Sequence, residues 1–138
     1  STGKILPVEG TAFDLRNGVL IKERLFSTEQ QMVYGMGFNH NFVLNNQNRG
    51  MRKVATAIDL QSSRQLNIWT DRPGLHFYTG NYLNGITGKK GDRYKQYGGF
   101  CFETQNYPDA INFRHFPSPI LKAGEVFRST TIFEFLNK

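Results

Sequence analysis

Glu103 lies at the centre of a segment whose other residues are typical of a β-strand. Residues 100–105 alternate, so that Phe100 and Phe102 take one face and the opposite face carries Cys101, Glu103 and Gln105. Carboxylates are depleted in strand centres, and a buried one is costly unless it is hydrogen-bonded or functional. Two interpretations follow: a general base in a cleft, or a solvent-facing glutamate on a half-exposed sheet. The pattern alone does not decide between them.

The three histidines, His40, His76 and His115, lie far apart in the sequence, and no spacing among them builds a metal site. An isolated structural or surface role is therefore the first interpretation of each. His76 shares a strand face with Tyr78, an arrangement that suits a binding site as well as it suits packing. The same two readings apply to Trp69, whose ring could stack on a ligand or simply pack.

Several classes of chemistry are excluded by what the chain lacks. The single cysteine, Cys101, rules out an intramolecular disulfide and a thiol cluster for a metal. No Ser-His-Asp spacing, nucleophile elbow, phosphate-binding loop or dinucleotide fingerprint is present. Any chemistry must therefore rest on isolated acids, bases and hydrogen-bonding groups that the fold brings together.

The elements that must position these groups are almost all extended. Residues 52–60 alternate, with Val54, Thr56, Ile58 and Leu60 on one face. A polar turn at 61–64 and a second alternating run at 65–70 predict a hairpin. Further strands are predicted at 75–79, 100–105 and 126–136, and residues 80–99, with six glycines, are predicted to form a long loop without a core-forming pattern. The chain is predicted to be all-β and largely antiparallel.

Size and charge set the remaining bounds. At 138 residues the chain predicts one domain, residues 1–138, without an internal boundary. No apolar run approaches the length of a membrane span, and residues 1–10 lack the apolar core of a signal peptide, so no membrane association is expected. The net charge of +6 and the basic stretch at 89–95 suggest the hypothesis of nucleic-acid binding, but the other basic residues are scattered and a solvated loop explains the stretch.

Five phrases, in order, resemble the aldose 1-epimerase (galactose mutarotase) family. They are LPVEGTAFDLR (6–16), GFNHNFVLN (37–45), RPGLHFYTGNYLNG (72–85), GFCFETQNYPDAIN (99–112) and FPSPILKAGE (116–125), followed by TTIFEF. The resemblance covers the C-terminal portion of the family's length, so the chain is expected to be a fragment or one half of a split protein. It implies an antiparallel β-sandwich, of which this chain would be an incomplete part.

The family's activity, as the resemblance implies it, is interconversion of the α and β anomers of aldohexoses such as galactose and glucose. A glutamate takes the proton of the C1 hydroxyl while a histidine protonates the ring oxygen, the ring opens, and closure from the other face inverts C1. Glu103 matches the glutamate of the family's ETQ phrase. The acid histidine belongs to the N-terminal portion, and none of the three histidines here matches it. The chain alone is therefore expected to be catalytically incomplete.

Two positions depart from the family's pattern. Asn39 stands where the family usually has an aspartate that binds sugar hydroxyls, and His76 where members often carry a glutamine that reaches the sugar. Both keep hydrogen-bonding capacity but change charge or geometry, which suggests altered sugar preference. The resemblance implies no cofactor and no metal, an aldohexose as substrate, a complementary N-terminal portion as partner, and a cytoplasmic setting.

Three hypotheses remain open. The first is the C-terminal part of a mutarotase that is active once an N-terminal part supplies the acid. The second is a sugar-binding or regulatory relative that has lost catalysis, and the third is a nucleic-acid-binding surface. A piece cut from a larger sandwich is also expected to expose strand edges and an apolar face, and so to aggregate or dimerise when alone.

Overall fold

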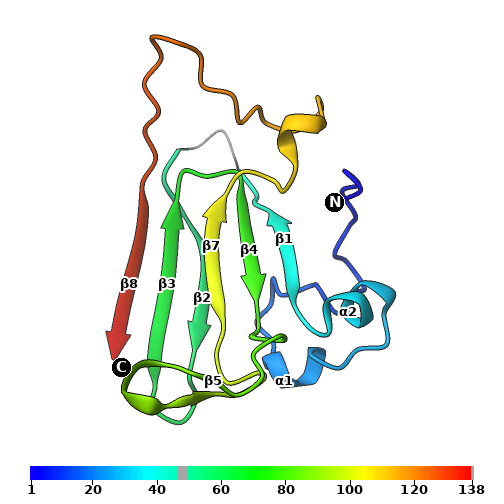
Figure 1. Cartoon of the computed structure of the whole chain (residues 1–138), viewed down its shortest axis with the longest axis vertical. Helices are drawn as coiled ribbons and strands as arrows, with labels where there is room; N and C mark the ends of the chain where they lie inside the picture. The colour runs from blue at the N-terminus through cyan, green and yellow to red at the C-terminus, as the bar shows by residue number, and fades with distance from the viewer. Residues whose placement is uncertain (47–49, 138) are drawn as a thin grey trace. The chain divides into compact units, whose positions relative to one another are not determined.

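The computed structural model describes residues 1–46 and 50–137. The elements are α1 (Ile21–Arg24), α2 (Gln30–Gly35), β1 (Asn39–Val43), β2 (Arg52–Ile58), β3 (Arg64–Thr70), β4 (Gly74–Tyr78), β5 (Ile86–Thr87), η2 (Lys89–Gly91), β6 (Arg93–Tyr94), β7 (Cys101–Gln105), η3 (Ala110–Asn112) and β8 (Thr131–Asn137) (Figure 1). Strands dominate, which confirms the all-β prediction. The chain divides into two compact units: residues 1–3, 41–75 and 103–138 form the first, and residues 4–40 and 76–102 the second.

The first unit is built on a sheet of order β2-β3-β8 (Figure 1). The predicted hairpin of residues 52–60 and 65–70 is confirmed as the antiparallel pair of β2 and β3, and β8 pairs with β3 in an unbroken register from Arg64↔Asn137 to Thr70↔Thr131. The register between β2 and β3 shifts between Lys53 and Ala55, where Val54 forms a β-bulge.

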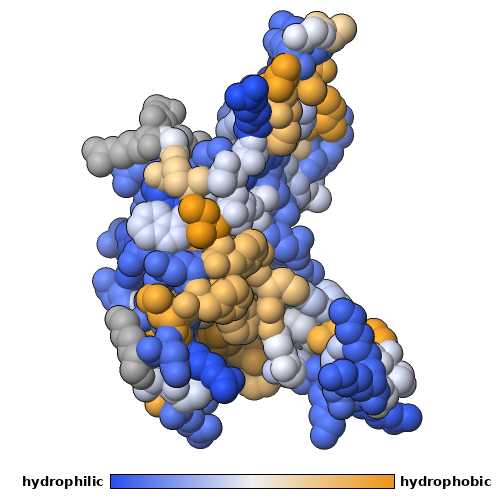
Figure 2. Space-filling view, turned by 90° about the vertical axis from the view of Figure 1, so that its left-hand side faces the viewer, coloured by the Kyte–Doolittle hydropathy of each residue, from blue (hydrophilic) through white to orange (hydrophobic). Residues whose placement is uncertain are grey.

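One face of this sheet carries most of its apolar side chains. Ala55 and Ala57 of β2 lie opposite Ile68 and Leu66, which in turn lie opposite Phe133 and Phe135 of β8. Ile68 is fully buried, whereas Phe133 is 50% and Phe135 77% exposed. Figure 2, which views the molecule from the side on which β8 lies in Figure 1, shows apolar side chains gathered on that surface. The unit therefore has a core of its own but leaves part of its apolar face in contact with solvent.

The second unit is held together by aromatic packing. The ring of Phe38 is fully buried and packs on Phe13 and Phe77, with centroids 5.7 and 4.9 Å away. Phe77 in turn contacts Phe102, with centroids 5.2 Å apart, and Met32 of α2 is also buried. The prediction that His76 and Tyr78 share a strand face is confirmed, because both are partly exposed while Leu75, Phe77 and Thr79 are buried.

Strands β1, β4 and β7 form a second three-stranded sheet, with β4 in the middle. The boundary between the two units crosses all three strands, so that each strand contributes residues to both units. β4 and β7 confirm the strands predicted at 75–79 and 100–105. β1 was not predicted from the sequence, since its run of Asn, His and Asn lacks the apolar alternation of a half-buried strand.

The prediction for residues 80–99 is only partly right. The segment is largely irregular, with a short hairpin of β5 and β6 that presents the basic stretch Lys89 to Lys95 to solvent. It does contribute to the core, however, because Asn81 is only 1% exposed. A polar side chain can be buried here because backbone carbonyls are available to satisfy it. Within the described residues, both α-helices are far too short to cross a membrane, and no helix qualifies as a span.

Candidate functional site

Asn39 and His76 form a direct hydrogen bond across neighbouring strands. The Oδ1 atom of Asn39, at the start of β1, lies 2.9 Å from Nε2 of His76 in β4. Both residues belong to the second unit and are partly exposed. Because an amide oxygen can only accept, the proton of this bond is on His76 Nε2. Two of the three predicted site residues are thus joined on the face of β1 and β4 opposite the buried aromatic rings.

His40 lies on the other face of β1, toward those rings. Its Nδ1 atom accepts the backbone N–H of Asn39 at 3.0 Å, and its ring packs edge-on against Phe13 with centroids 4.7 Å apart. Burial is the main cause that lowers the pKa of His40, and the nearby His76 lowers it further, while a hydrogen bond with the backbone of Gln31 acts in the opposite direction. These contacts agree with a structural role for this histidine, but the ring is not isolated, because it is hydrogen-bonded to the predicted site residue Asn39.

Glu103 lies in the middle of β7, with its side chain exposed. Cys101 is exposed as well, whereas Phe102 between them is half-buried, so the predicted alternation is present. The exposure agrees with the solvent-facing interpretation for this chain as it stands. Glu103 belongs to the first unit and the Asn39–His76 pair to the second.

Asn81 holds the turn that leads from α2 into β1. Its Nδ2 atom donates to the carbonyl oxygens of Gly35 and Phe38 at 2.6 and 2.8 Å, and its Oδ1 accepts from Thr79 Oγ1 at 2.6 Å. Gly37 within the turn has φ +122°, and a Cβ added there would lie 2.9 Å from Asn81 Oδ1. The backbone immediately before Asn39 is therefore fixed by a fully satisfied buried amide.

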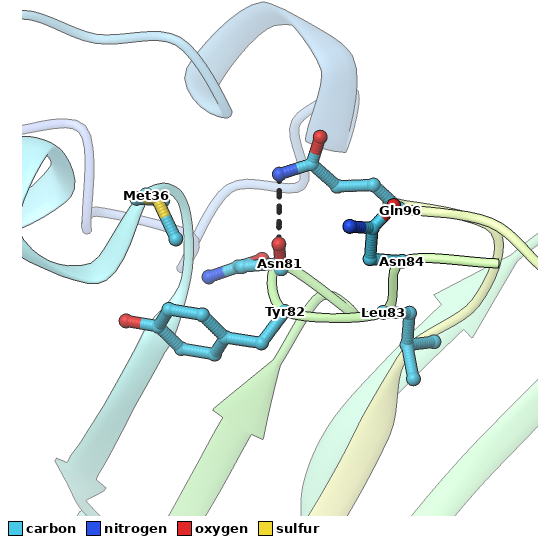
Figure 3. A pocket seen from close by; sticks show the side chains of 6 residues that line it. All are labelled: Met36, Asn81, Tyr82, Leu83, Asn84 and Gln96. Carbon is cyan, nitrogen blue, oxygen red and sulfur yellow. Dashed lines mark hydrogen bonds between the residues drawn. The ribbon is translucent and has the colours of Figure 1, made fainter. Parts of the chain in front are cut away.

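An open pocket of about 340 Å³ lies over this turn (Figure 3). Its lining residues are Met36, Asn81, Tyr82, Leu83, Asn84 and Gln96. The Gln96 side chain donates through Nε2 to the carbonyl oxygen of Asn81 at 2.7 Å, which joins the two ends of the 80–99 segment. Neither Asn39 nor His76 lines the pocket. The pocket is therefore separate from the Asn39–His76 pair.

Trp69 and Glu134 form a polar cluster on the face of the β2-β3-β8 sheet opposite Ile68. Glu134 Oε2 accepts from Asn67 Nδ2 at 2.8 Å and from Trp69 Nε1 at 3.3 Å. These hydrogen bonds, that of Asn67 first, lower the pKa of Glu134. Of the two interpretations of Trp69, this contact agrees with packing, since the ring donates a hydrogen bond to Glu134 of the neighbouring strand.

The last histidine, His115, lies in the first unit near the chain's start. Its Nε2 atom is 2.9 Å from the carbonyl oxygen of Gly3, and its ring packs on Phe116. Among the described residues, no three His, Cys, Asp or Glu side chains lie close enough to hold a metal ion.

Comparison with known proteins identifies the family. The family model for aldose 1-epimerase matches residues 1–134. The chain belongs to the aldose 1-epimerase family. It is 44% identical to galactose mutarotase from Rattus norvegicus over 97% of its length and 30% identical to aldose 1-epimerase from Escherichia coli over 94%. It spans 38% of the length of each of these two relatives.

The structural comparison supports the same fold. The crystal structure of a GalM/aldose epimerase homologue from C. elegans superposes with a TM-score of 0.85 at 28% identity, over 99% of this chain and 40% of that one. The antiparallel aldose epimerase fold implied by the resemblance is therefore confirmed. The family's phrases predicted Asn39 and His76 as site residues, a prediction that stays open, but they gave no sign of Asn81, which holds the turn before Asn39 and follows a buried strand within a stretch otherwise rich in turn residues.

Proposed function

We propose that this chain contributes the base and part of the sugar-binding site of an aldose 1-epimerase that interconverts the anomers of galactose or glucose. The observation that carries the proposal is membership of the family over nearly the whole chain, with galactose mutarotases among the relatives. The hydrogen-bonded pair of Asn39 and His76 supports it, because two partly exposed polar groups on adjacent strands suit the hydroxyls of a sugar.

In the proposed reaction Glu103 acts as the general base. Its carboxylate takes the proton from the C1 hydroxyl while an acid protonates the ring oxygen, and the bond between C1 and the ring oxygen breaks to leave the open-chain aldehyde. Rotation about the C1–C2 bond presents the other face of the carbonyl, and ring closure reverses both proton transfers. The proton count is unchanged over one turnover, so the reaction needs neither a redox partner nor a group donor.

The proposed acid is a histidine from the part of the family's length that this chain does not span. His40 is engaged with the backbone of Asn39, and His115 with that of Gly3, so both have structural contacts of their own. An acid on the opposite side of the sugar from Glu103 would have to be brought by a complementary segment. Asn39 and His76 are proposed to bind hydroxyls and to hold the sugar in place.

A second function, sugar binding without catalysis, is favoured by one specific observation. Asn39 Oδ1 already accepts a hydrogen bond from His76 Nε2, so part of the hydrogen-bonding capacity that a sugar would use is satisfied within the pair. An amide at position 39 is also neutral, which weakens its hydrogen bonds to hydroxyls relative to a carboxylate. Such a site suits recognition of a sugar with a different pattern of hydroxyls.

Polarimetry separates the two functions. Freshly dissolved α-D-galactose or α-D-glucose is followed with the chain alone and with the chain mixed with the N-terminal segment of a family member. We expect acceleration of mutarotation in the mixture, reduced by at least about 100-fold in Glu103→Gln. The exposed Glu9→Gln serves as the matched control and retains the wild-type rate. A mixture no faster than buffer, together with measurable sugar binding by calorimetry, refutes the enzyme and leaves the binding protein.

A further inference from the structure

The proposed reaction gives His40 no part, yet this ring is the group most closely engaged with the Asn39 backbone. Its Nδ1 atom accepts the Asn39 N–H at 3.0 Å, while the side chain of the same Asn39 accepts from His76 Nε2 at 2.9 Å. A single residue thus receives one hydrogen bond through its side chain and gives one through its backbone. The two bonds lie on opposite faces of β1, since His40 follows the buried Phe38 in the strand alternation.

The position of the His40 ring is fixed by its neighbours. Phe13 packs against it edge-on at 4.7 Å, and Gly35 leaves it room, because a Cβ at Gly35 would lie 2.9 Å from His40 Cε1. The backbone of Gln31 in α2 is hydrogen-bonded to the ring. Since Nδ1 is an acceptor, Nε2 carries the proton, and the ring is held as one neutral tautomer.

We propose that His40 is a positioning residue whose neutral imidazole anchors the Asn39 backbone and thereby holds the Asn39 side chain against His76. The claim that Asn39 and His76 bind sugar rests on the proposed function, whereas the relay from His40 through Asn39 to His76 rests on the distances alone. Protonation of His40 replaces the Nδ1 lone pair with a second donor facing the Asn39 N–H. The anchoring bond is then lost, and the pair on the opposite face is released.

The relay is therefore sensitive to pH in a defined direction. The groups that the structure describes around the ring are Phe13, Gln31, Gly35, Asn39 and His76. Burial and His76 both lower the pKa of His40 from 6.5. The relay is intact at neutral pH and is lost as the pH falls through the lowered pKa. Stability linked to this ring follows the same direction, decreasing from 6.5 downward.

Nuclear magnetic resonance on the complete chain, with ¹⁵N-labelled histidine and asparagine, tests the relay directly. We expect His40 to show the Nε2–H tautomer at neutral pH. As His40 titrates, the Asn39 side-chain amide and the His76 ring nitrogens shift with the same midpoint, while the His115 ring, in the first unit, does not follow it. Resonances of Asn39 and His76 that stay constant through the His40 titration overturn the proposal, and this arm needs no substitution.

Two substitutions at position 40 form a matched pair. In His40→Asn the amide oxygen occupies the place of Nδ1 and can still accept the Asn39 N–H, whereas in His40→Gln the amide lies near the place of Nε2 and cannot. We expect His40→Asn to keep the wild-type chemical shifts of Asn39 and His76 but to lose their pH dependence. In His40→Gln we expect the wild-type chemical shifts of both residues to be lost. Identical behaviour of the two variants indicates a merely structural ring and overturns the relay.

Galactose titration of the same samples separates this inference from the proposed function. We expect binding to weaken about tenfold in His40→Gln and to remain within about twofold in His40→Asn, because the loss corresponds to about one well-placed hydrogen bond. Equal affinities of the two variants overturn the inference while leaving the proposed function standing. A wild-type chain that shows the coupled pH titration but binds no sugar even when mixed with the N-terminal segment of a family member supports the relay and refutes the proposed function.

Discussion

Replacing Asn81 by alanine should destabilise the second unit far more than its position in an irregular segment suggests. The buried amide makes three hydrogen bonds, two donated to carbonyls of the turn before β1 and one accepted from Thr79. Each contributes about 1 kcal/mol net, so Asn81→Ala is expected to lose about 3 kcal/mol of unfolding free energy. For 138 residues, this corresponds to a fall in Tm of about 10 °C.

The assay is urea or thermal unfolding of variants that differ only in this amide. Asn81→Asp keeps the shape of the side chain but removes both donor hydrogens, and we expect it to be at least as unstable as Asn81→Ala. Asn84→Ala, an exposed amide from the same pocket, is the matched control and should stay within about 0.5 kcal/mol of the wild type. If Asn81→Ala loses no more than the control, the turn is not held by Asn81 and the reasoning fails.

Three further perturbations test other parts of the structure. Gly37 has φ +122°, and a new Cβ there would lie 2.9 Å from both Asn81 and Leu25, so Gly37→Ala should lose about 2 kcal/mol of unfolding free energy in denaturant. A new Cβ at Gly99 meets open space, so Gly99→Ala is the control, and equal losses in the two variants would contradict this steric account. The fluorescence of Trp69, the only tryptophan, should change in acid with a midpoint below pH 4.5, because Glu134 is then protonated and the stability that comes from its lowered pKa is lost. A fluorescence transition that persists in Glu134→Gln would assign the change to another group. Phe135→Ser, at the 77% exposed end of the apolar face, should reduce concentration-dependent association in sedimentation velocity, and unchanged association would show that this face is not responsible.

The strands could be predicted wherever the apolar residues alternate. Residues 52–60 and 65–70 alternate clearly, and their pairing was predicted, but the side of β2 that packs was not. The bulge at Val54 lets Ala55 and Ala57 face the core residues Ile68 and Leu66, while Ile58 is exposed. A one-residue shift exchanges the two faces of a strand, and the sequence of β2 does not signal where the bulge occurs.

The site was predictable only in part. Glu103, Asn39 and His76 were predicted as site residues because the family's phrases mark them, and these roles stay predictions. The contact between Asn39 and His76 required the strand neighbours that the structure supplies. The helices α1 and α2, with 4 and 6 residues, are too short to leave a periodic pattern. Asn81 was missed because a buried asparagine in an irregular segment is recognised only by the carbonyls it satisfies, and those lie more than 40 residues earlier in the chain.

Strand β8 follows a long and mostly irregular segment of the first unit, residues 106–130, in which η3 is the one regular element. Its seven-residue register with β3 is nevertheless complete, and side-chain bonds from Glu134 and Thr131 support it. The covalent link is therefore not what keeps β8 in place. A protease cut within residues 106–130 would leave β8 bound as a separable peptide, and a synthetic copy of residues 131–137 would exchange with it.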